Sequence, residues 1–186
     1  MHDVVSEPGC EGTNPSGLAG LRVWVRDVVF ALLTAVLLVV FVIQPVRVEG
    51  TSMEPRLHDQ ERIFVNKFIY RFEEIQRGDV VVFWYPRDPN KSFIKRVVGL
   101  PGERVLIRDG RVYVDDVSLD EPYVPPQFLD SASYGPVVVP PESYFVLGDH
   151  RNSSNDSRSW GCVPREYIFG KAVFRYWPVS RLGLIE

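Results

Sequence analysis

The sequence predicts a mainly β protein of antiparallel strands, preceded by a single N-terminal helix of membrane-spanning length. Residues Val28 to Val46 are nineteen consecutive uncharged residues. As a helix rising about 1.5 Å per residue they would measure roughly 28 Å, close to the hydrocarbon thickness of a bilayer, about 30 Å. After Arg47 the pattern changes to short β-branched and aromatic runs separated by Gly, Pro and Asp. This second pattern is typical of strands and turns.

The N-terminal part is expected to comprise a disordered tail over residues 1–22 and a transmembrane anchor over 23–46. The tail mixes Glu, Pro, Gly and Ser with few bulky apolar groups, a composition typical of disorder. The apolar run ends in Ile43-Gln44-Pro45-Val46 and has no small-residue exit of the A-x-A kind, so an uncleaved anchor is favoured over a cleaved signal. The alternative is a buried core helix, which is disfavoured because the run is apolar on every side.

Residues 47–186 are expected to form one β-rich domain. The apolar runs that predict its strands are 80–85, 93–98, 105–107, 112–114, 137–139 and 144–147. Asp109-Gly110 lies between two of them and predicts a two-residue hairpin turn. One amphipathic helix is expected over 61–70. The segment 115–141, rich in Pro and Asp, is expected to be a long surface excursion.

Composition argues against several classes of partner. The formal net charge is −3 and the Lys and Arg residues are scattered, so no nucleic acid partner is expected. Cys10 and Cys162 would lie on opposite sides of a membrane, which predicts no internal disulfide. Three dispersed histidines form no metal-ligand pattern. We therefore expect no metal and no cofactor.

Ser52, six residues beyond the apolar run, is a candidate nucleophile. A serine hydroxyl needs a base within hydrogen-bond reach, and no histidine lies in a convincing setting. A lysine serves if burial lowers its pKa by roughly 3–5 units. Lys95 fits, because it interrupts an apolar strand and shares a face with Phe93 and Val97. The alternative is an edge-strand lysine that prevents aggregation.

Four segments resemble the four catalytic-domain boxes of bacterial type I signal peptidases, in the order of that family and directly after the predicted anchor. They are GTSMEPRL (50–57), RGDVVVF (77–83), IKRVVGLPG (94–102) and GDHRNSSNDSRSWG (148–161). The resemblance covers nearly the whole chain. It implies the antiparallel β-sheet catalytic domain of that family and a membrane-bound serine endopeptidase with a Ser/Lys dyad.

The resemblance also implies roles for individual residues. Ser52 matches the nucleophile, Lys95 the general base, and Ser154 the serine that orients the lysine amine. Two structural ion pairs are implied, Asp149 with Arg96 and Asp156 with Arg158. Small-residue substrate pockets are implied for Val46, Val48, Met53, Leu57, Phe93 and Ile94. The chain departs from the family pattern at Arg56 and His150, and at Gly50, where some members carry a serine that assists the oxyanion hole.

The implied substrates are precursor proteins that carry signal peptides. The implied location is the bacterial cytoplasmic membrane, with one anchor in contact with lipid and the catalytic domain on the extracytoplasmic side. An extended substrate is expected to pair with strand edges near residues 46–50 and 92–94. Pairing puts the first and third residues before the cleaved bond into pockets and turns the middle one away.

Three alternative functions remain open at this point. One is a Ser/Lys peptidase dedicated to a single precursor. Another is a non-catalytic, membrane-anchored β-domain that binds peptides. The last is a hydrolase that uses His150 beside Asp149, which requires the His150 side chain to reach Ser52.

Overall fold

The computed structural model describes residues 17–185, without the side chains of residues 17–19, 38, 40 and 41. Contacts divide the chain into two units, with the boundary between Val39 and Val40. Most of the expected tail and Cys10 lie outside the described residues.

The N-terminal helix α1 spans Gly17–Val42. It begins before the expected start at residue 23 and ends before the expected end at residue 46. The residues that follow form strand β1, Ile43–Arg47. Pro45 lacks an N–H and fits an edge strand better than a helix interior, and β1 is an edge strand of its sheet. Over the residues that the structure describes, no helix combines the length and the hydropathy needed to cross a membrane.

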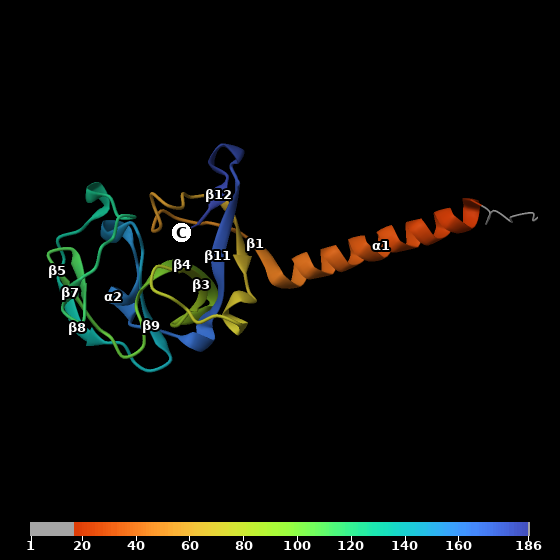
Figure 1. The fold of residues 1–186 in the computed structure, drawn as a ribbon. Coiled ribbons are helices and arrows are strands. Elements are labelled where there is room, and N and C mark those ends of the chain that lie inside the picture. Colours follow the sequence, from red (N-terminus) through yellow and green to blue (C-terminus); the bar gives the residue numbers. More distant parts are fainter. Residues whose placement is uncertain (1–16, 186) are drawn as a thin grey trace, which may run out of the picture. The chain divides into compact units, whose positions relative to one another are not determined.

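The second unit is built on two antiparallel sheets, which confirms the mainly β prediction (Figure 1). The larger sheet is composed, in spatial order, of β1 Ile43–Arg47, β2 Arg62–Asn66, β11 Ile168–Trp177, β3 Val80–Tyr85, β4 Asp88–Gly99, β9 Ser143–Leu147 and β10 Val163–Pro164, with β12 Gly183–Leu184 paired to β11. The pairing of β9 with β4 starts only at Arg96. The preceding half of β4 therefore pairs with β3 alone among the described strands.

The smaller sheet has four strands. In spatial order they are β7 Val117–Ser118, β6 Arg111–Val114, β5 Arg104–Arg108 and β8 Tyr134–Val138. The predicted hairpin joins β5 to β6, with Arg108 paired to Arg111. Asp109 and Gly110 have φ of 49° and 76°, as a two-residue hairpin loop requires. A buried apolar cluster that includes Val98, Val105 and Phe145 joins the two sheets.

Short helices connect the strands. They are η1 Ile69–Arg71, η2 Pro126–Phe128, η3 Arg151–Ser153, α2 Ser157–Trp160, η4 Arg165–Tyr167 and η5 Val179–Arg181. The expected helix over 61–70 is wrong, because Arg62–Asn66 forms β2. Ile63 and Val65 alternate into the core, and this period of two favours a strand.

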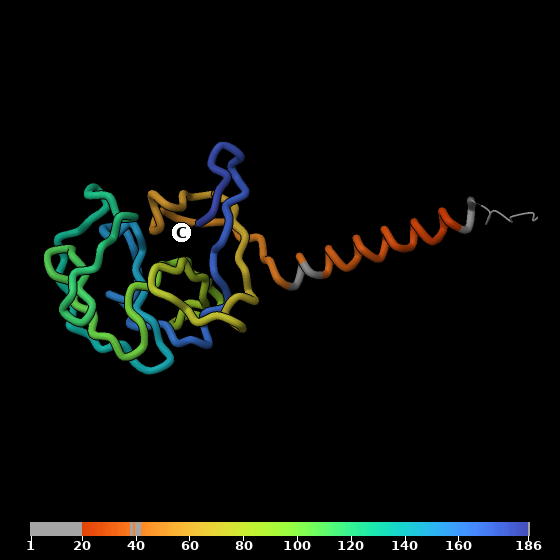
Figure 2. The backbone as a smooth tube through the Cα atoms, in the orientation of Figure 1, coloured from red at the N-terminus to blue at the C-terminus, as the bar shows by residue number. Residues whose placement is uncertain are grey.

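The segment 115–141, drawn in green to teal in Figure 2, is more than the surface excursion that its composition predicts. It contributes β7 and β8 to the smaller sheet. Val139 is fully buried and Val124 nearly so. Val124 and Val139 thus belong to the core, whereas Val117, Leu129 and Val138 are exposed.

Candidate active site

Ser52 lies in the turn that follows β1, and its neighbours hold that turn in place. Gly50 has φ of +88°, a conformation that favours glycine, and its N–H donates to Asp59 Oδ1 at 2.9 Å. Beyond Ser52, the buried side chains of Met53 and Leu57 anchor the turn in the core. Ser52 is therefore presented on a short, well-anchored segment.

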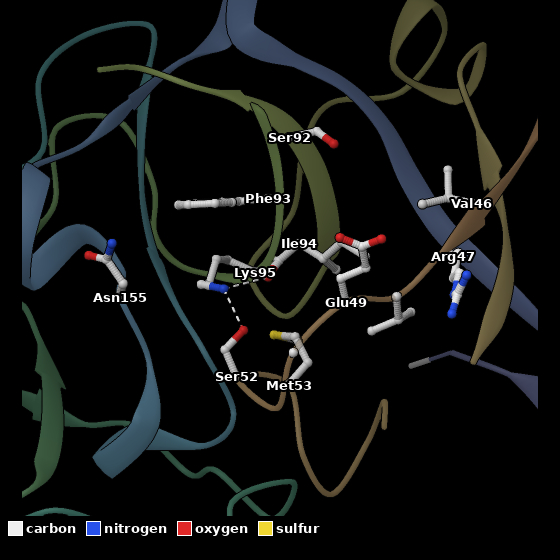
Figure 3. Close-up of a pocket in the computed structure, with 12 residues that line it drawn as sticks. Val46, Arg47, Glu49, Ser52, Met53, Ser92, Phe93, Ile94, Lys95 and Asn155 are labelled. Atoms are coloured by element: carbon white, nitrogen blue, oxygen red, sulfur yellow. Dashed lines mark hydrogen bonds between the residues drawn. The ribbon is translucent and has the colours of Figure 1, made fainter. Parts of the chain in front are cut away.

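The hydroxyl of Ser52 meets the amine of Lys95, which comes from the middle of β4. Lys95 Nζ donates to Ser52 Oγ at 2.7 Å and to the Ile94 carbonyl at 2.9 Å (Figure 3). The amine also lies 5.4 Å from the centre of the Phe93 ring. Two residues separated by 43 positions thus form a direct nucleophile–base contact.

Burial gives Lys95 the properties that a base requires. The residue is 4% exposed, which excludes a solvent-exposed edge lysine. Burial lowers the pKa of Lys95 from 10.5 to about 8, and the carboxylates of Asp156 and Asp149 partly oppose this shift. A substantial fraction of the amine is therefore neutral on the alkaline side of neutrality.

A cavity of about 410 Å³ opens beside the dyad (Figure 3). Its lining includes Ser52 and Lys95 and five of the six residues expected to bind substrate, namely Val46, Val48, Met53, Phe93 and Ile94. Leu57 is different, because it is fully buried in the core cluster that contains Met53 and does not line the cavity. The lining also includes Arg47, Glu49, Gly50 and Ser92, which lie on the strand edges expected to pair with substrate, and Asn155, which was not expected.

Both expected ion pairs form. Arg96 Nε and Nη2 donate to the two carboxylate oxygens of Asp149 at 2.8 Å each, with both side chains buried. Arg158 Nε and Nη2 bind Asp156 at the same distances. Asp156 Oδ2 also accepts the N–H of Gly148 at 3.1 Å. These bonds fix the chain from Gly148 onward, next to the nucleophile.

Ser154 does not make its expected hydrogen bond to Lys95. Its Oγ is buried and has no hydrogen-bond partner among the described residues. The Ile94 carbonyl instead accepts from the amine. Ser154 packs against Gly148, so closely that a Cβ at residue 148 would lie 2.2 Å from its hydroxyl.

His150 approaches Ser52 through its backbone and not through its imidazole. The His150 N–H donates to the Ser52 carbonyl at 3.1 Å. The ring Nδ1 lies 3.1 Å from the Thr51 carbonyl and 3.7 Å from Glu54. The neighbouring Asp149 carboxylate is engaged by Arg96. The side chains thus lack the contacts of a Ser/His/Asp triad.

Segment 115–141 contributes side-chain contacts that support the chain around Gly148 and Arg96, and sequence reasoning missed them. Arg151 donates to the Gly148 carbonyl at 3.0 Å and to Glu121 at 2.9 Å. The Tyr123 ring lies 4.0 Å from the Arg96 guanidinium, and its hydroxyl donates to Glu121 at 2.9 Å. Contacts between residues some 30 positions apart leave no local pattern in the sequence, so the residues around Glu121 resemble only a Pro-rich loop.

A second group that sequence reasoning missed supports the Ser52 turn from the C-terminal side. Arg175 donates to the Arg56 carbonyl at 2.7 Å, and Arg181 donates to the Pro55 carbonyl at 3.1 Å. Both arginines also bind Glu61, which is 3% exposed. Burial raises the pKa of Glu61, and the charge of Arg175 opposes the rise. Arginines near the C-terminus gave no signal in the sequence.

Comparison with known proteins shows the family. The family described as signal peptidase, peptidase S26, matches residues 21–177. A probable signal peptidase I of Synechocystis sp. is 43% identical over 168 residues, 86% of this chain and 75% of that protein. The signal peptidase I of Leptolyngbya laminosa is 39% identical over 181 residues, 92% of this chain and 87% of that protein. A crystal structure of a signal peptidase I from Enterococcus faecalis V583 is 33% identical and covers 53% of this chain and 97% of that one, with a TM-score of 0.48. The family match and these two relatives show that this chain belongs to the signal peptidase family, peptidase S26.

Proposed function

We propose that this chain is a serine endopeptidase that removes N-terminal signal peptides from exported precursor proteins, with Ser52 as nucleophile and Lys95 as general base. The 2.7 Å contact between Lys95 Nζ and Ser52 Oγ carries this proposal. A pKa of about 8 supports it, because a neutral amine can accept the serine proton. Membership in the signal peptidase family supports the class of substrate.

The reaction proceeds through an acyl-enzyme. Neutral Lys95 takes the proton of Ser52 while the serine oxygen attacks the scissile carbonyl, and the resulting ammonium returns the proton to the departing amine. Lys95 then activates the water that hydrolyses the ester. The Ser52 N–H is one donor to the oxyanion. The Gly50 N–H already binds Asp59.

For the supporting residues we propose the roles that the family resemblance implies. Arg96 with Asp149 and Arg158 with Asp156 hold the chain around Gly148. Ser154 is proposed to orient the lysine amine once substrate enters. Its buried hydroxyl has no hydrogen-bond partner in residues 17–185 and is available for such a bond.

The substrate binds in an extended form between two open strand edges. One edge is β1 and the residues that follow it, and the other is the first half of β4, which β9 does not cover. Main-chain pairing fixes the register, and alternate side chains enter the apolar part of the cavity. Small side chains fit there.

A large side chain directly before the bond is expected to block cleavage. Peptides with Ala at the first and third residues before the bond should be cut. Replacing the first Ala by Phe should lower kcat/KM by about 100-fold or more, since overfilling a packed pocket costs about 1–3 kcal/mol and displaces the carbonyl. Chromatography of the products measures the rates. Equal rates for the Ala and Phe peptides contradict the pocket.

The pH dependence of kcat/KM is expected to follow the loss of the proton from Lys95 and not to depend on His150. The base must be neutral, so kcat/KM should rise with pH through about 8 and level off above it. His150→Ala should keep this limb, with a modest loss of rate, because its ring contacts Thr51 and Glu54 and not the Ser52 hydroxyl. Initial rates from pH 6 to 10 test both statements. A limb near pH 6.5 that disappears in His150→Ala would favour a histidine base.

We further propose that the apolar run anchors the enzyme in the bacterial cytoplasmic membrane, with residues 47–186 on the extracytoplasmic side. The uncharged part of α1, residues 28–42, and its exposed apolar side chains, such as Trp24 and Phe30, support this. In cells, the domain should be digested by external protease while the N-terminus is protected. Extraction of the full chain by alkaline carbonate would contradict an integral anchor.

The function itself is tested with the detergent-solubilised full chain and an exported precursor, followed by N-terminal sequencing of the product. A covalent serine probe should label the chain and fail to label Ser52→Ala. Absence of both cleavage and labelling would favour a non-catalytic peptide-binding domain. Cleavage of one precursor among many would favour a dedicated peptidase.

A further inference from the structure

The cavity beside the dyad contains a carboxylate that the proposed chemistry does not use. Glu49 is exposed and lines the cavity. Among the described residues, the Glu49 side chain has no hydrogen bond or ion pair. An uncompensated charge in a peptide-binding groove acts on whatever substrate side chain comes near it.

The neighbouring Arg47 does not neutralise this charge by direct contact. Figure 3 shows the Arg47 guanidinium and the Glu49 carboxylate apart from each other. Arg47 acts electrostatically on Asp59, where it contributes to a lowered pKa, after the hydrogen bonds from Gln60 and Gly50. Asp59 in turn accepts the Gly50 N–H.

The backbone of Glu49 is open toward the substrate. Val48 uses its N–H to bind the Glu61 carbonyl at 2.8 Å and its carbonyl to accept from Gln60 at 2.9 Å. Successive residues of an extended chain direct their N–H and C=O groups to opposite sides. The Glu49 N–H and C=O therefore point away from Gln60 and Glu61, and they make no hydrogen bond to a described residue. A peptide strand can pair with them.

Side-chain alternation identifies the substrate residue that Glu49 meets. Val46 and Val48 pack with the apolar cluster below the groove, whereas Arg47 and Glu49 are exposed on the other face. When two strands pair, side chains directly opposite each other lie on the same face of the sheet. The small residues, first and third before the bond, share the face of the valines. The second residue before the bond shares the face of Glu49.

We propose that Glu49 is a specificity-determining residue, which favours a cationic side chain and disfavours an acidic one at the second residue before the scissile bond. The inference rests on the proposed function and adds a charge preference to its site. Glu49 is not among the groups that shift the Lys95 pKa. Its effect should therefore appear in substrate selection and not in the pH limb.

The test uses three peptides that differ only at this second position, with Lys, Gln or Glu between two alanines. For the detergent-solubilised full chain, kcat/KM should fall in the order Lys, Gln, Glu, with a Lys-to-Glu ratio of about three to ten, as expected for exposed charge pairs. Glu49→Gln should bring the ratio close to one, and Glu49→Arg should invert it. High salt should reduce the preference.

A matched control and a binding measurement complete the design. Glu73→Gln removes another exposed carboxylate outside the cavity and should keep the wild-type ratio. For Glu49→Gln, the rise of kcat/KM with pH should have the same midpoint as in the wild type. A substitution that distorted the Ser52–Lys95 pair would shift this midpoint. Kd values of the same peptides for Ser52→Ala give the charge preference without cleavage.

The outcomes separate this inference from the proposed function. Ser52-dependent cleavage with equal rates for the Lys and Glu peptides overturns the role of Glu49 and leaves the peptidase standing. A charge preference that persists in Glu49→Gln also overturns it. Charge-dependent binding to Ser52→Ala without cleavage by the wild type supports Glu49 and contradicts the peptidase. Failure of every peptide to bind contradicts the groove and with it the inference.

Discussion

Replacing Lys95 by Ala or Met is expected to abolish cleavage at every pH from 6 to 10. A positioned base contributes about 10²- to 10⁴-fold in rate, and among the described side chains only Lys95 forms a hydrogen bond with the Ser52 hydroxyl. Ser52→Ala should be equally inactive. Lys95→Arg should not rescue, since a guanidinium stays protonated and cannot accept the serine proton. Single-turnover assays with a signal-peptide substrate measure the loss.

Lys95→Met should also be more stable than the wild type. A measured increase in stability would show that its inactivity is not caused by unfolding. The pKa of Lys95 falls from a reference value of 10.5 to about 8 in the folded chain. At neutral pH the protonated amine is therefore less stable in the folded chain than in the unfolded one, and this opposes folding by on the order of 3 kcal/mol. Two lost hydrogen bonds offset part of the gain. The net increase in the free energy of unfolding should be about 1 kcal/mol at pH 7.

The sign of this effect can be checked with pH. Between about pH 8 and 10.5 the unfolded chain holds the Lys95 proton and the folded chain does not, so wild-type stability should rise through this window. Lys95→Met should lack this contribution. Lys91→Ala removes an exposed lysine of the same strand and should keep both activity and the pH dependence. Normal turnover by Lys95→Met would refute the dyad.

Gly148→Ala is expected to lower kcat by about 100-fold, although residue 148 makes no contact with substrate in the proposed mechanism. A Cβ at this position would lie 2.4 Å from the Ser52 carbonyl oxygen and 2.2 Å from Ser154 Oγ. The hydroxyl can rotate, but the Ser52 backbone has to move. A displacement of about 1 Å at a nucleophile costs on the order of 10²-fold. Rates and thermal unfolding should be measured together.

Two further variants identify the contact responsible. In Gly148→Ala with Ser154→Ala, the hydroxyl clash is removed, but the contacts with the Ser52 carbonyl oxygen at 2.4 Å and with the Ser154 Cβ at 2.6 Å stay, so activity should recover only in part relative to Ser154→Ala alone. Gly183→Ala places a Cβ in open space and should leave activity unchanged. Wild-type kcat in Gly148→Ala would mean that the nucleophile turn moves without consequence.

Local patterns were sufficient for most of the fold. A short, continuous run of β-branched and aromatic residues such as 80–85 is a local property of the sequence and predicts a buried strand without knowledge of its neighbours. Asp109-Gly110 determines a hairpin because its backbone conformation is local. The helix expected over 61–70 was wrong because periods of 2 and 3.6 are hard to distinguish in a short segment such as β2.

By itself, the sequence determined the β class, the hairpin, the apolar N-terminal run and, through four ordered boxes, the family and the candidate pair Ser52 and Lys95. Only the tertiary structure decided that Lys95 is buried, that its amine meets the Ser52 hydroxyl, and that Leu57 lies in the core instead of the cavity. It also revealed Glu121 and Arg181 as supports of the site. The physical reason is that a lowered lysine pKa and an ion pair across 30 or more residues depend on desolvation and distance in space, and neither quantity is encoded in a local run of residues.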